Sequence, residues 1–105
     1  MVASEAVLRG NYGPQLARKI TSRIAALRAV DRASDLFVLP GRWHAMTGDL
    51  KGNLSADLVH PQRLLVRPQT PAQLDEHGGI DWTATTAVTV AGIVDTHRAE
   101  ERRRT

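Results

Sequence analysis

Two neighbouring stretches decide the fold of this chain. Residues 39–58 read Leu39-Pro-Gly-Arg-Trp-His44-Ala-Met-Thr-Gly48-Asp-Leu-Lys51-Gly-Asn-Leu54-Ser-Ala-Asp-Leu58, and residues 62–67 read Gln62-Arg-Leu-Leu-Val-Arg67. Leu54, Ala56 and Leu58 alternate with Ser55 and Asp57, which is typical of a half-buried strand. The stretch therefore predicts a small sheet rather than a helix.

The turns around this strand define two hairpins. Gly48–Gly52 is a plausible loop after a short strand at Trp43–Met46, and His60-Pro61 lies where the chain would turn back. Arg63–Arg67 then returns as a strand that Pro68 stops. We expect an antiparallel arrangement of these segments.

The C-terminal half supplies one more strand. Residues 68–82 contain two prolines and the pair Gly78-Gly79, which predicts an exposed loop. Thr85–Asp95 is rich in valine, threonine and isoleucine and predicts the clearest strand of the chain. The charged residues 98–105 form a tail after a single domain at 1–97.

The N-terminal half predicts helix. Leu16, Ile20, Ile24 and Leu27 recur at spacings of four, four and three, so they form one stripe of an amphipathic helix over residues 14–30. Residues 3–9 suggest a short preceding helix. Helices followed by strands give an α+β domain, with helices packed on a small twisted antiparallel sheet. The helix at 14–30 is the strong candidate to cover the sheet.

Composition narrows the function classes. The 105-residue chain has no cysteine, which excludes a disulfide framework and a thiolate metal site. We see neither a membrane-spanning run nor the features of a signal peptide, and a cytoplasmic protein without a cofactor is the simplest interpretation. Twelve of the fourteen basic residues are arginine and the net charge is +3, which favours an anionic partner, either nucleic acid or an acidic protein.

Five residues on or beside the predicted strands form a set able to bind a phosphate and move a proton. They are His44, Lys51, Arg63, Asp95 and His97. A histidine is a natural general acid or base near neutral pH, and the cations can stabilise a pentacovalent phosphorane. Such a set suits cleavage of RNA by its own 2′-hydroxyl group. A metal is not expected, because the four histidines show no short ligand spacing.

Each member also has a purely structural interpretation. His97 is equally compatible with a solvated position beside the charged tail, and Asp95 with an ordinary ion pair. His44 follows Trp43 and fits a packed strand residue, while Lys51 fits a loop lysine that keeps the chain soluble. Residue types and spacing alone predict only a small basic α+β domain, with nucleic-acid binding as one possible function.

Several ordered motifs across roughly residues 5–97 resemble the RelE/ParE toxin superfamily, and its HigB-like branch most closely. They are Leu39-Pro-Gly-x-x-His44, Gly48-Asp49-x-Lys51-Gly52-x-Leu54-Ser55-x-Asp57-Leu58, His60-Pro61-Gln62-Arg63-Leu64-Leu65, Gly78-Gly79-Ile80-Asp81-Trp82 and Ile93-Val94-Asp95-Thr96-His97. The resemblance implies a type II toxin that cleaves mRNA on the translating ribosome without a metal. It implies as partners the mRNA and a helix-turn-helix antitoxin that neutralises the toxin, and no membrane.

The resemblance places the same five residues in the active site: His44, Lys51, Arg63, Asp95 and His97. As RNA-binding residues we take Arg18, Lys19, Arg23, Arg42 and Arg67. Two other functions remain open. One is a ParE-type gyrase inhibitor that needs no catalytic histidine, and the other is an inactive module that binds only the antitoxin.

The chain departs from the family pattern at three places. Relatives begin with a strand, and Met1-Val2-Ala3 is too short for one, so we expect the usual first strand to be missing. Either the true start lies upstream, or a partner or a second copy fills the missing place. Thr47 stands where lysine is common, which removes a cation. Thr96 stands where a tyrosine is often found.

Overall fold

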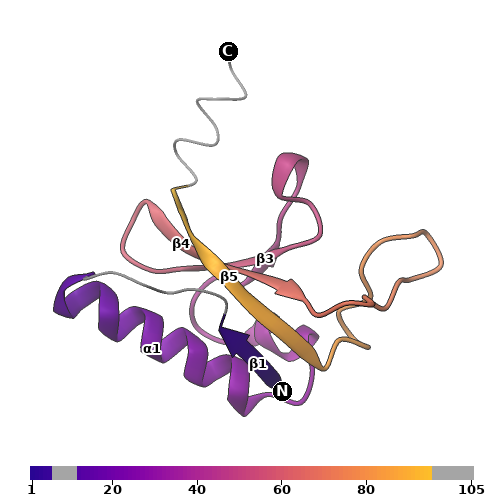
Figure 1. Ribbon diagram of the computed structural model, residues 1–105, viewed down its shortest axis with the longest axis horizontal. Helices are drawn as coiled ribbons and strands as arrows, with labels where there is room; N and C mark the ends of the chain where they lie inside the picture. The colour runs from indigo at the N-terminus through magenta and orange to yellow at the C-terminus, as the bar shows by residue number, and fades with distance from the viewer. Residues whose placement is uncertain (6–11, 96–105) are drawn as a thin grey trace.

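In the part of the chain that the structure describes, one α-helix packs on a five-stranded mixed sheet with strand order β1-β5-β4-β3-β2 (Figure 1). The computed structural model describes residues 1–5 and 12–95. The elements are β1 (Val2–Glu5), α1 (Gly13–Ala29), the 3₁₀ helix η1 (Ala33–Val38), β2 (His44–Ala45), the 3₁₀ helix η2 (Gly48–Leu50), β3 (Leu54–Asp57), β4 (Gln62–Pro68) and β5 (Ala87–Asp95). The α+β class is confirmed. His97 and the tail at 98–105 lie outside the described residues.

Helix α1 forms where the apolar spacing predicts it. Pro14 occupies its first turn, where a missing backbone N–H costs no helical hydrogen bond. The four stripe residues Leu16, Ile20, Ile24 and Leu27 are all buried and join one core cluster with the sheet. The sheet side of that cluster comprises Leu54, Ala56, Leu58, Leu64, Val66, Val88 and Val90. The helix therefore covers one face of the sheet, as expected.

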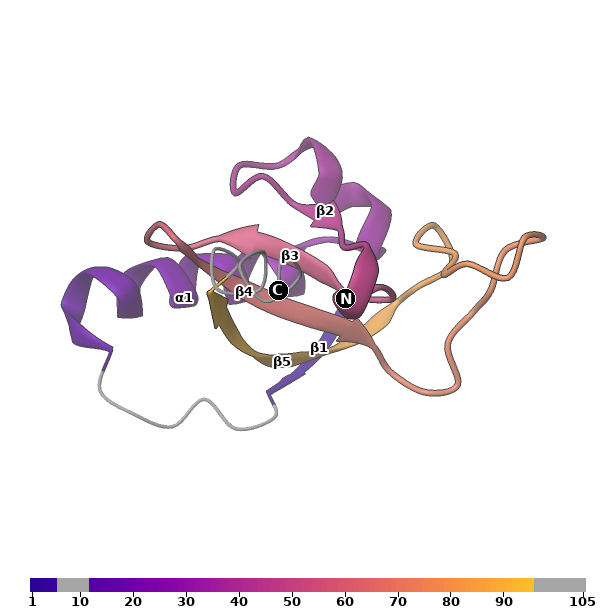
Figure 2. The same ribbon diagram turned by 90° about the horizontal axis from the view of Figure 1, so that it is seen from above.

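Strands β2 to β5 form an antiparallel meander, with β2 and β1 at opposite edges of the sheet (Figure 2). The turn between β2 and β3 holds η2, and the turn between β3 and β4 holds a cis His60–Pro61 peptide bond. Strand β4 ends at Pro68, where the sequence predicts a stop. The two predicted hairpins are confirmed.

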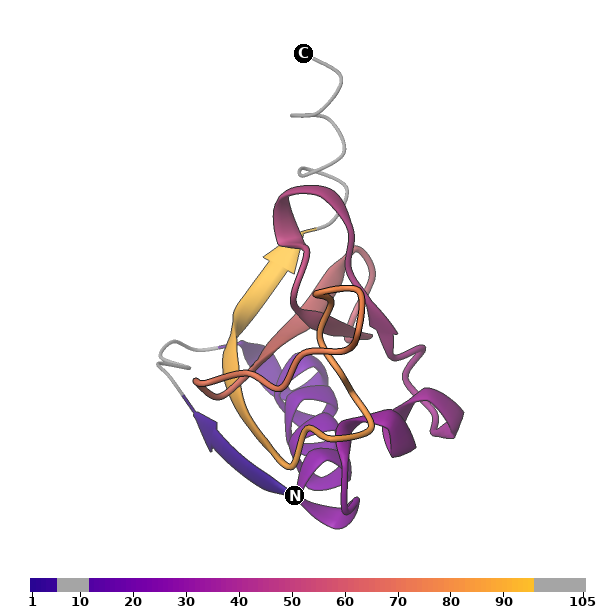
Figure 3. The same cartoon turned by 90° about the vertical axis from the view of Figure 1, so that its right-hand side faces the viewer.

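The predicted absence of a first strand is wrong. Residues Val2–Glu5 form β1, which pairs in parallel with β5 from Val2 opposite Ala87 to Glu5 opposite Val90 (Figure 3). The sheet is therefore mixed rather than wholly antiparallel, and residues 3–5 are not helical. Four residues suffice because their hydrogen-bonding partner is a strand of nine residues, a long-range pairing that local composition does not reveal. The place expected for a partner or a second copy is thus taken by the chain itself.

Residues 69–86 form the loop that projects from the sheet (Figure 1). It is mostly exposed, as predicted, but it is braced internally. Leu74 and Ile80 form an isolated bridge, and Asp75 Oδ1 accepts the backbone N–H groups of His77 and Gly79 at 2.9 Å each. At its base, the backbone N–H of Ser34 donates to the carbonyl of Trp82 at 3.0 Å. The loop is therefore fixed to η1.

Strand alternation sets which side chains of β3 and β4 face away from α1, on both sides of a bulge in β5. Leu65 pairs with Gly92 and Val66 with Val90, so β5 has one extra residue between these two pairs. The core residues Leu64 and Val66 face α1 on both sides of the bulge. Strand alternation then turns Ser55, Asp57, Arg63, Leu65 and Arg67 to the opposite face. We call this surface the open face.

Candidate functional site

A buried arginine holds together three strands of the open face. The side chain of Arg63 is only 10% exposed, and its Nε donates to Ser55 Oγ at 2.8 Å. Its Nη1 donates to the carboxylate of Asp57, with which it forms an ion pair. Its Nη2 donates to the carbonyl of Arg42 at 2.8 Å and lies 3.1 Å from His44 Nδ1. Burial lowers the pKa of Arg63, Asp57 raises it and the charge of Arg42 lowers it again.

The strand register explains why these side chains meet. Asp57 lies directly opposite Arg63 across β3 and β4, and Ser55 lies opposite His44 across β2 and β3. Residues directly opposite each other point to the same face of a sheet. Three adjacent strands therefore place a carboxylate, a hydroxyl group, an imidazole and a guanidinium next to one another on the open face.

His44 has two alternative hydrogen-bonded states. Its Nδ1 lies 3.1 Å from the carbonyl oxygen of Arg42 and 3.1 Å from Arg63 Nη2. With Nδ1 unprotonated, the ring accepts from Arg63. With a proton on Nδ1, the ring donates to the carbonyl, and in the neutral tautomer Nε2 is then an acceptor. In that second state the imidazole can take a proton from a bound hydroxyl group.

Arg42 adds a second, solvent-facing cation. Its side chain is 82% exposed, and its Nε lies 3.7 Å from Asp57 Oδ2. Its φ of +51° is in the left-handed region, which a non-glycine residue adopts at a cost of about 1 kcal/mol. The carbonyl that accepts from Arg63 thus belongs to a strained turn, held by that hydrogen bond.

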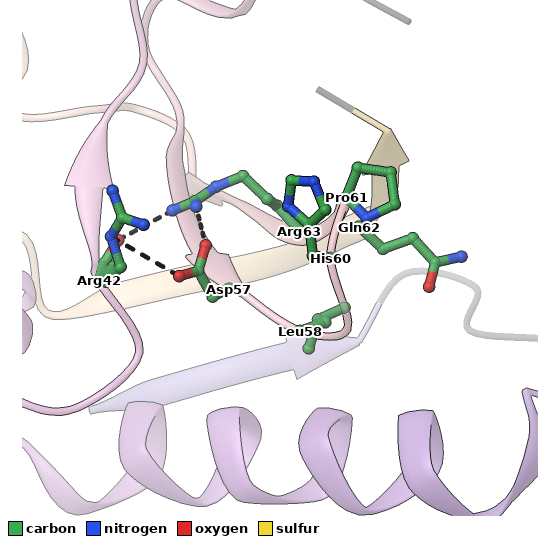
Figure 4. A pocket seen from close by; sticks show the side chains of 7 residues that line it. All are labelled: Arg42, Asp57, Leu58, His60, Pro61, Gln62 and Arg63. Carbon is green, nitrogen blue, oxygen red and sulfur yellow. Dashed lines mark hydrogen bonds and ion pairs between the residues drawn. The ribbon is translucent and has the colours of Figure 1, made fainter. Parts of the chain in front are cut away.

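A pocket of about 370 Å³ opens beside this cluster. Figure 4 shows Arg42, Asp57 and Arg63 on one side and His60 and Pro61 of the β3–β4 turn on the other. Leu58 and Gln62 complete its lining. Two arginines, one carboxylate and an exposed histidine around a small opening can bind an anion and exchange a proton with it.

Of the five predicted catalytic residues, the structure brings together His44 and Arg63. Lys51 lines a different pocket, bounded by the 69–86 loop. Asp95 pairs with Gln62, so it lies on the face opposite to Arg63, although the two strands are neighbours. His97 is outside the described residues. Asp95 and Arg63 are therefore on neighbouring strands but on different faces of the sheet.

The five predicted RNA-binding residues do not share one surface. Arg18 and Lys19 are exposed on α1, whereas Arg67 is exposed on the open face, in β4. Arg23 instead joins α1 to the sheet, because its Nε donates to the carbonyl of Asp57 at 2.8 Å. A Cβ atom at Gly41 would lie 2.8 Å from that Nε, so the glycine makes room for the guanidinium.

Sequence reasoning missed four contributors to the site: Ser55, Asp57, His60 and Gln62. The alternation in residues 54–58 already placed Ser55 and Asp57 on the polar face of a strand. The hairpin register, which pairs Asp57 with Arg63, would have identified the ion pair. His60 and Gln62 carry no such signal, since their position depends on the conformation of the turn.

Among residues 1–5 and 12–95, no group of three His, Asp or Glu side chains is placed to hold a metal ion. Over the same residues, no helix is long and apolar enough to span a membrane. Comparisons with protein-family models, with curated proteins and with solved structures found no match to the chain.

Proposed function

We propose that this protein is the toxin of a type II toxin–antitoxin pair of the RelE/ParE superfamily, HigB-like branch. In this proposal it cleaves mRNA on the translating ribosome in the cytoplasm, without a metal, and a helix-turn-helix antitoxin neutralises it. The observation that carries the proposal is the contact between His44 and Arg63 on the open face, beside the exposed guanidinium of Arg42.

The chemistry of this contact fits cleavage of RNA by its own 2′-hydroxyl group. His44, held through Nδ1 by the carbonyl of Arg42, would accept the 2′-proton at Nε2. The oxygen so activated attacks the adjacent phosphorus, and the P–O5′ bond breaks to leave a 2′,3′-cyclic phosphate. Arg42 would stabilise the charge that develops on the phosphorane, and His60 across the pocket could protonate the leaving 5′-oxygen.

The presence of β1 also supports the resemblance. Relatives begin with a strand before the first helix, and Val2–Glu5 supplies one parallel to β5. The substitution at Thr47, directly before η2, remains a departure from the family pattern.

A specific observation favours a second candidate, binding without catalysis. The guanidinium of Arg63 already donates to Ser55, Asp57 and the carbonyl of Arg42, which is the arrangement of a structural arginine. A ParE-type gyrase inhibitor or an inactive antitoxin-binding module would need no more than this scaffold and a basic surface.

Expression without the antitoxin, followed by mapping of mRNA 5′ ends, separates these functions. The toxin should arrest growth and produce cuts linked to codons, and His44→Ala should abolish both. His77→Ala is the matched control, because His77 is an exposed histidine in the 69–86 loop. Arrest with intact mRNA and inhibited supercoiling would instead establish the gyrase inhibitor, and persistent cuts in a folded His44→Ala variant would remove His44 from the mechanism.

A further inference from the structure

A second pocket lies at the β2 edge of the sheet, between the β2–β3 hairpin and the 69–86 loop. It measures about 310 Å³, and its walls include the side chains of Met46, Ile80 and Trp82 together with Lys51. Among the residues that the structure describes, the lining has Lys51 as its one cation and contains no carboxylate. An apolar pocket with a single charged group is typical of a site for a small ligand that has a flat apolar part and one anionic part.

Both sides of this pocket are held by backbone hydrogen bonds. On the hairpin side, the N–H of Met46 donates to the carbonyl of Asn53 at 2.8 Å, and that of Lys51 to Gly48 at 3.1 Å. On the loop side, the carbonyl of Trp82 is bound by Ser34. The indole ring is thus presented from a fixed backbone, which lowers the entropy lost when a ring stacks on it.

Two glycines of the pocket lining have positive φ angles. Gly52 and Gly78 lie in its lining with φ angles of +93° and +82°, a region that favours glycine. No heavy atom lies within 4 Å of the position that a Cβ would take at either residue.

The pocket borders the His44–Arg63 contact at β2. Met46 lines the pocket, and its Sδ accepts from Ser55 Oγ at 3.0 Å, the hydroxyl group to which Arg63 Nε also donates. Ala45 lines the pocket, and the preceding residue, His44, turns to the open face beside Arg63. Met46 follows His44 by two residues, and alternate side chains of an extended segment point to the same face. A single strand of nucleic acid lying across this edge can therefore place a phosphate near Arg42 and a neighbouring base in the pocket.

We propose that this pocket is a base-binding subsite for single-stranded RNA. The base stacks on Trp82 between Met46 and Ile80, and the ammonium group of Lys51 binds its phosphate. Stacking on an aromatic side chain combined with a basic contact is how proteins bind unpaired nucleotides. This inference rests on the proposed function for the identity of the nucleic acid.

The same pocket could in principle take an apolar side chain of a protein partner. The cation in its lining and the arginines beyond β2 favour the nucleotide, because both attract phosphate. An apolar side chain would gain nothing from either charge.

Tryptophan fluorescence gives a direct test with nucleoside monophosphates as probes. The chain has two tryptophans, and Trp43 is only 4% exposed, so a quenching ligand reports on Trp82. Nucleoside monophosphates should quench saturably, and Trp82→Phe should leave only the unresponsive signal of Trp43. Ala45→Phe, which fills the pocket without removing a polar group, should weaken binding at least tenfold.

Lys51 provides the charge control. Lys51→Gln should weaken binding of the monophosphate about fivefold, the factor that about 1 kcal/mol gives, and leave the uncharged nucleoside unaffected. Lys51→Arg should restore binding. If Ala45→Phe does not fold, the comparison of Lys51→Gln with Lys51→Arg provides the test instead.

Three results would overturn the proposed subsite. They are the absence of saturable quenching, a folded Ala45→Phe variant that binds nucleotide as tightly as the unmodified protein, and a Lys51→Gln variant that loses as much affinity for the nucleoside as for the nucleotide. Loss of antitoxin binding in Ala45→Phe with unchanged nucleotide quenching would assign the pocket to a protein partner. Mapping of mRNA ends keeps the two proposals apart. Cuts without nucleotide binding reject only the subsite, and nucleotide binding without cuts rejects only the nuclease.

Discussion

Arg63 on β4 and Asp57 on β3 lie directly opposite each other in the sheet and form an ion pair beneath the exposed side chain of Arg42. The carboxylate of Asp57 is thus shared between a buried cation and a solvent-facing one. Its side chain is 35% exposed, whereas that of Arg63 is 10% exposed. The pair belongs to the framework that positions His44 and Arg42, so stability and activity are coupled at this point.

Removing the guanidinium should destabilise the fold. Arg63→Met leaves the carboxylate of Asp57 and the hydroxyl group of Ser55 without their donor, and we expect a loss of about 3 kcal/mol in the free energy of unfolding. Urea denaturation followed by the fluorescence of buried Trp43 measures it. The double variant Asp57→Asn with Arg63→Met should lose less than the sum of the single losses. Additive losses would show that the two residues do not interact.

Arg23 and Arg18 should differ in their effect on stability, although both lie on α1. Arg23→Ala removes the 2.8 Å hydrogen bond to the carbonyl of Asp57 and should cost about 1.5 kcal/mol. Arg18→Ala alters an exposed side chain and should change the free energy of unfolding by less than about 0.5 kcal/mol. Thermal unfolding of the two variants side by side provides the measurement. Equal losses would contradict the proposed tie between α1 and β3.

Strand β1 can be tested by a charge placed on either of its faces. Ala3 is partly buried against the core, whereas Val2 is 61% exposed. Ala3→Glu should therefore lower the free energy of unfolding by about 2 kcal/mol, because it forces a carboxylate towards the core, and Val2→Glu should change it by less than about 0.5 kcal/mol. Chemical denaturation distinguishes the two. An Ala3→Glu variant with an unchanged free energy of unfolding would mean that β1 does not pack against the core.

Asp81 should contribute to the dependence of stability on pH. The hydroxyl group of Thr83 lowers the pKa of Asp81, helped by the backbone N–H groups of Thr83 and Ala84. The ionised form is therefore favoured by folding. Its contribution is present above the ordinary pKa of the group and is lost as the pH falls through the lower pKa of the folded state.

Titration of the Asp81 carboxyl carbon by NMR measures this effect. Thr83→Val should move the pKa of Asp81 upwards, towards its ordinary value, whereas Thr83→Ser should keep it low. Asp81→Asn should reduce the decrease in the free energy of unfolding that occurs as the pH falls. A pKa that does not respond to Thr83→Val would show that the hydroxyl group is not the cause.

Much of the fold could be predicted because its signals are local. The stripe from Leu16 to Leu27 specifies a helix and its buried face, and the alternation in residues 54–58 specifies a strand and its two sides. Proline at 68 and the glycines around η2 mark where strands end and turn. Each of these features follows from the backbone preferences of a few consecutive residues, so the meander could be recognised without tertiary information.

The candidate site was only partly predictable. His44 and Arg63 were identified as residue types suited to phosphate chemistry, but their contact requires the register of β2, β3 and β4. The position of Asp95 depended on face alternation at the end of β5, and Lys51 was separated from the cluster because its hairpin turns towards the 69–86 loop. Such relations arise between residues far apart in the chain, where no local preference applies.

The sequence by itself determined the helix, the hairpins and the polar side of β3, since side-chain spacing fixes which residues can be buried together. Only the tertiary structure decided that Val2–Glu5 is a strand, because its hydrogen-bonding partners lie in β5, more than 80 residues later in the sequence. It also decided that Arg63 is bound by Ser55 and Asp57 while Asp95 lies on the other face. The physical reason is that a sheet assigns each side chain to a face and a neighbour only once its strands have paired.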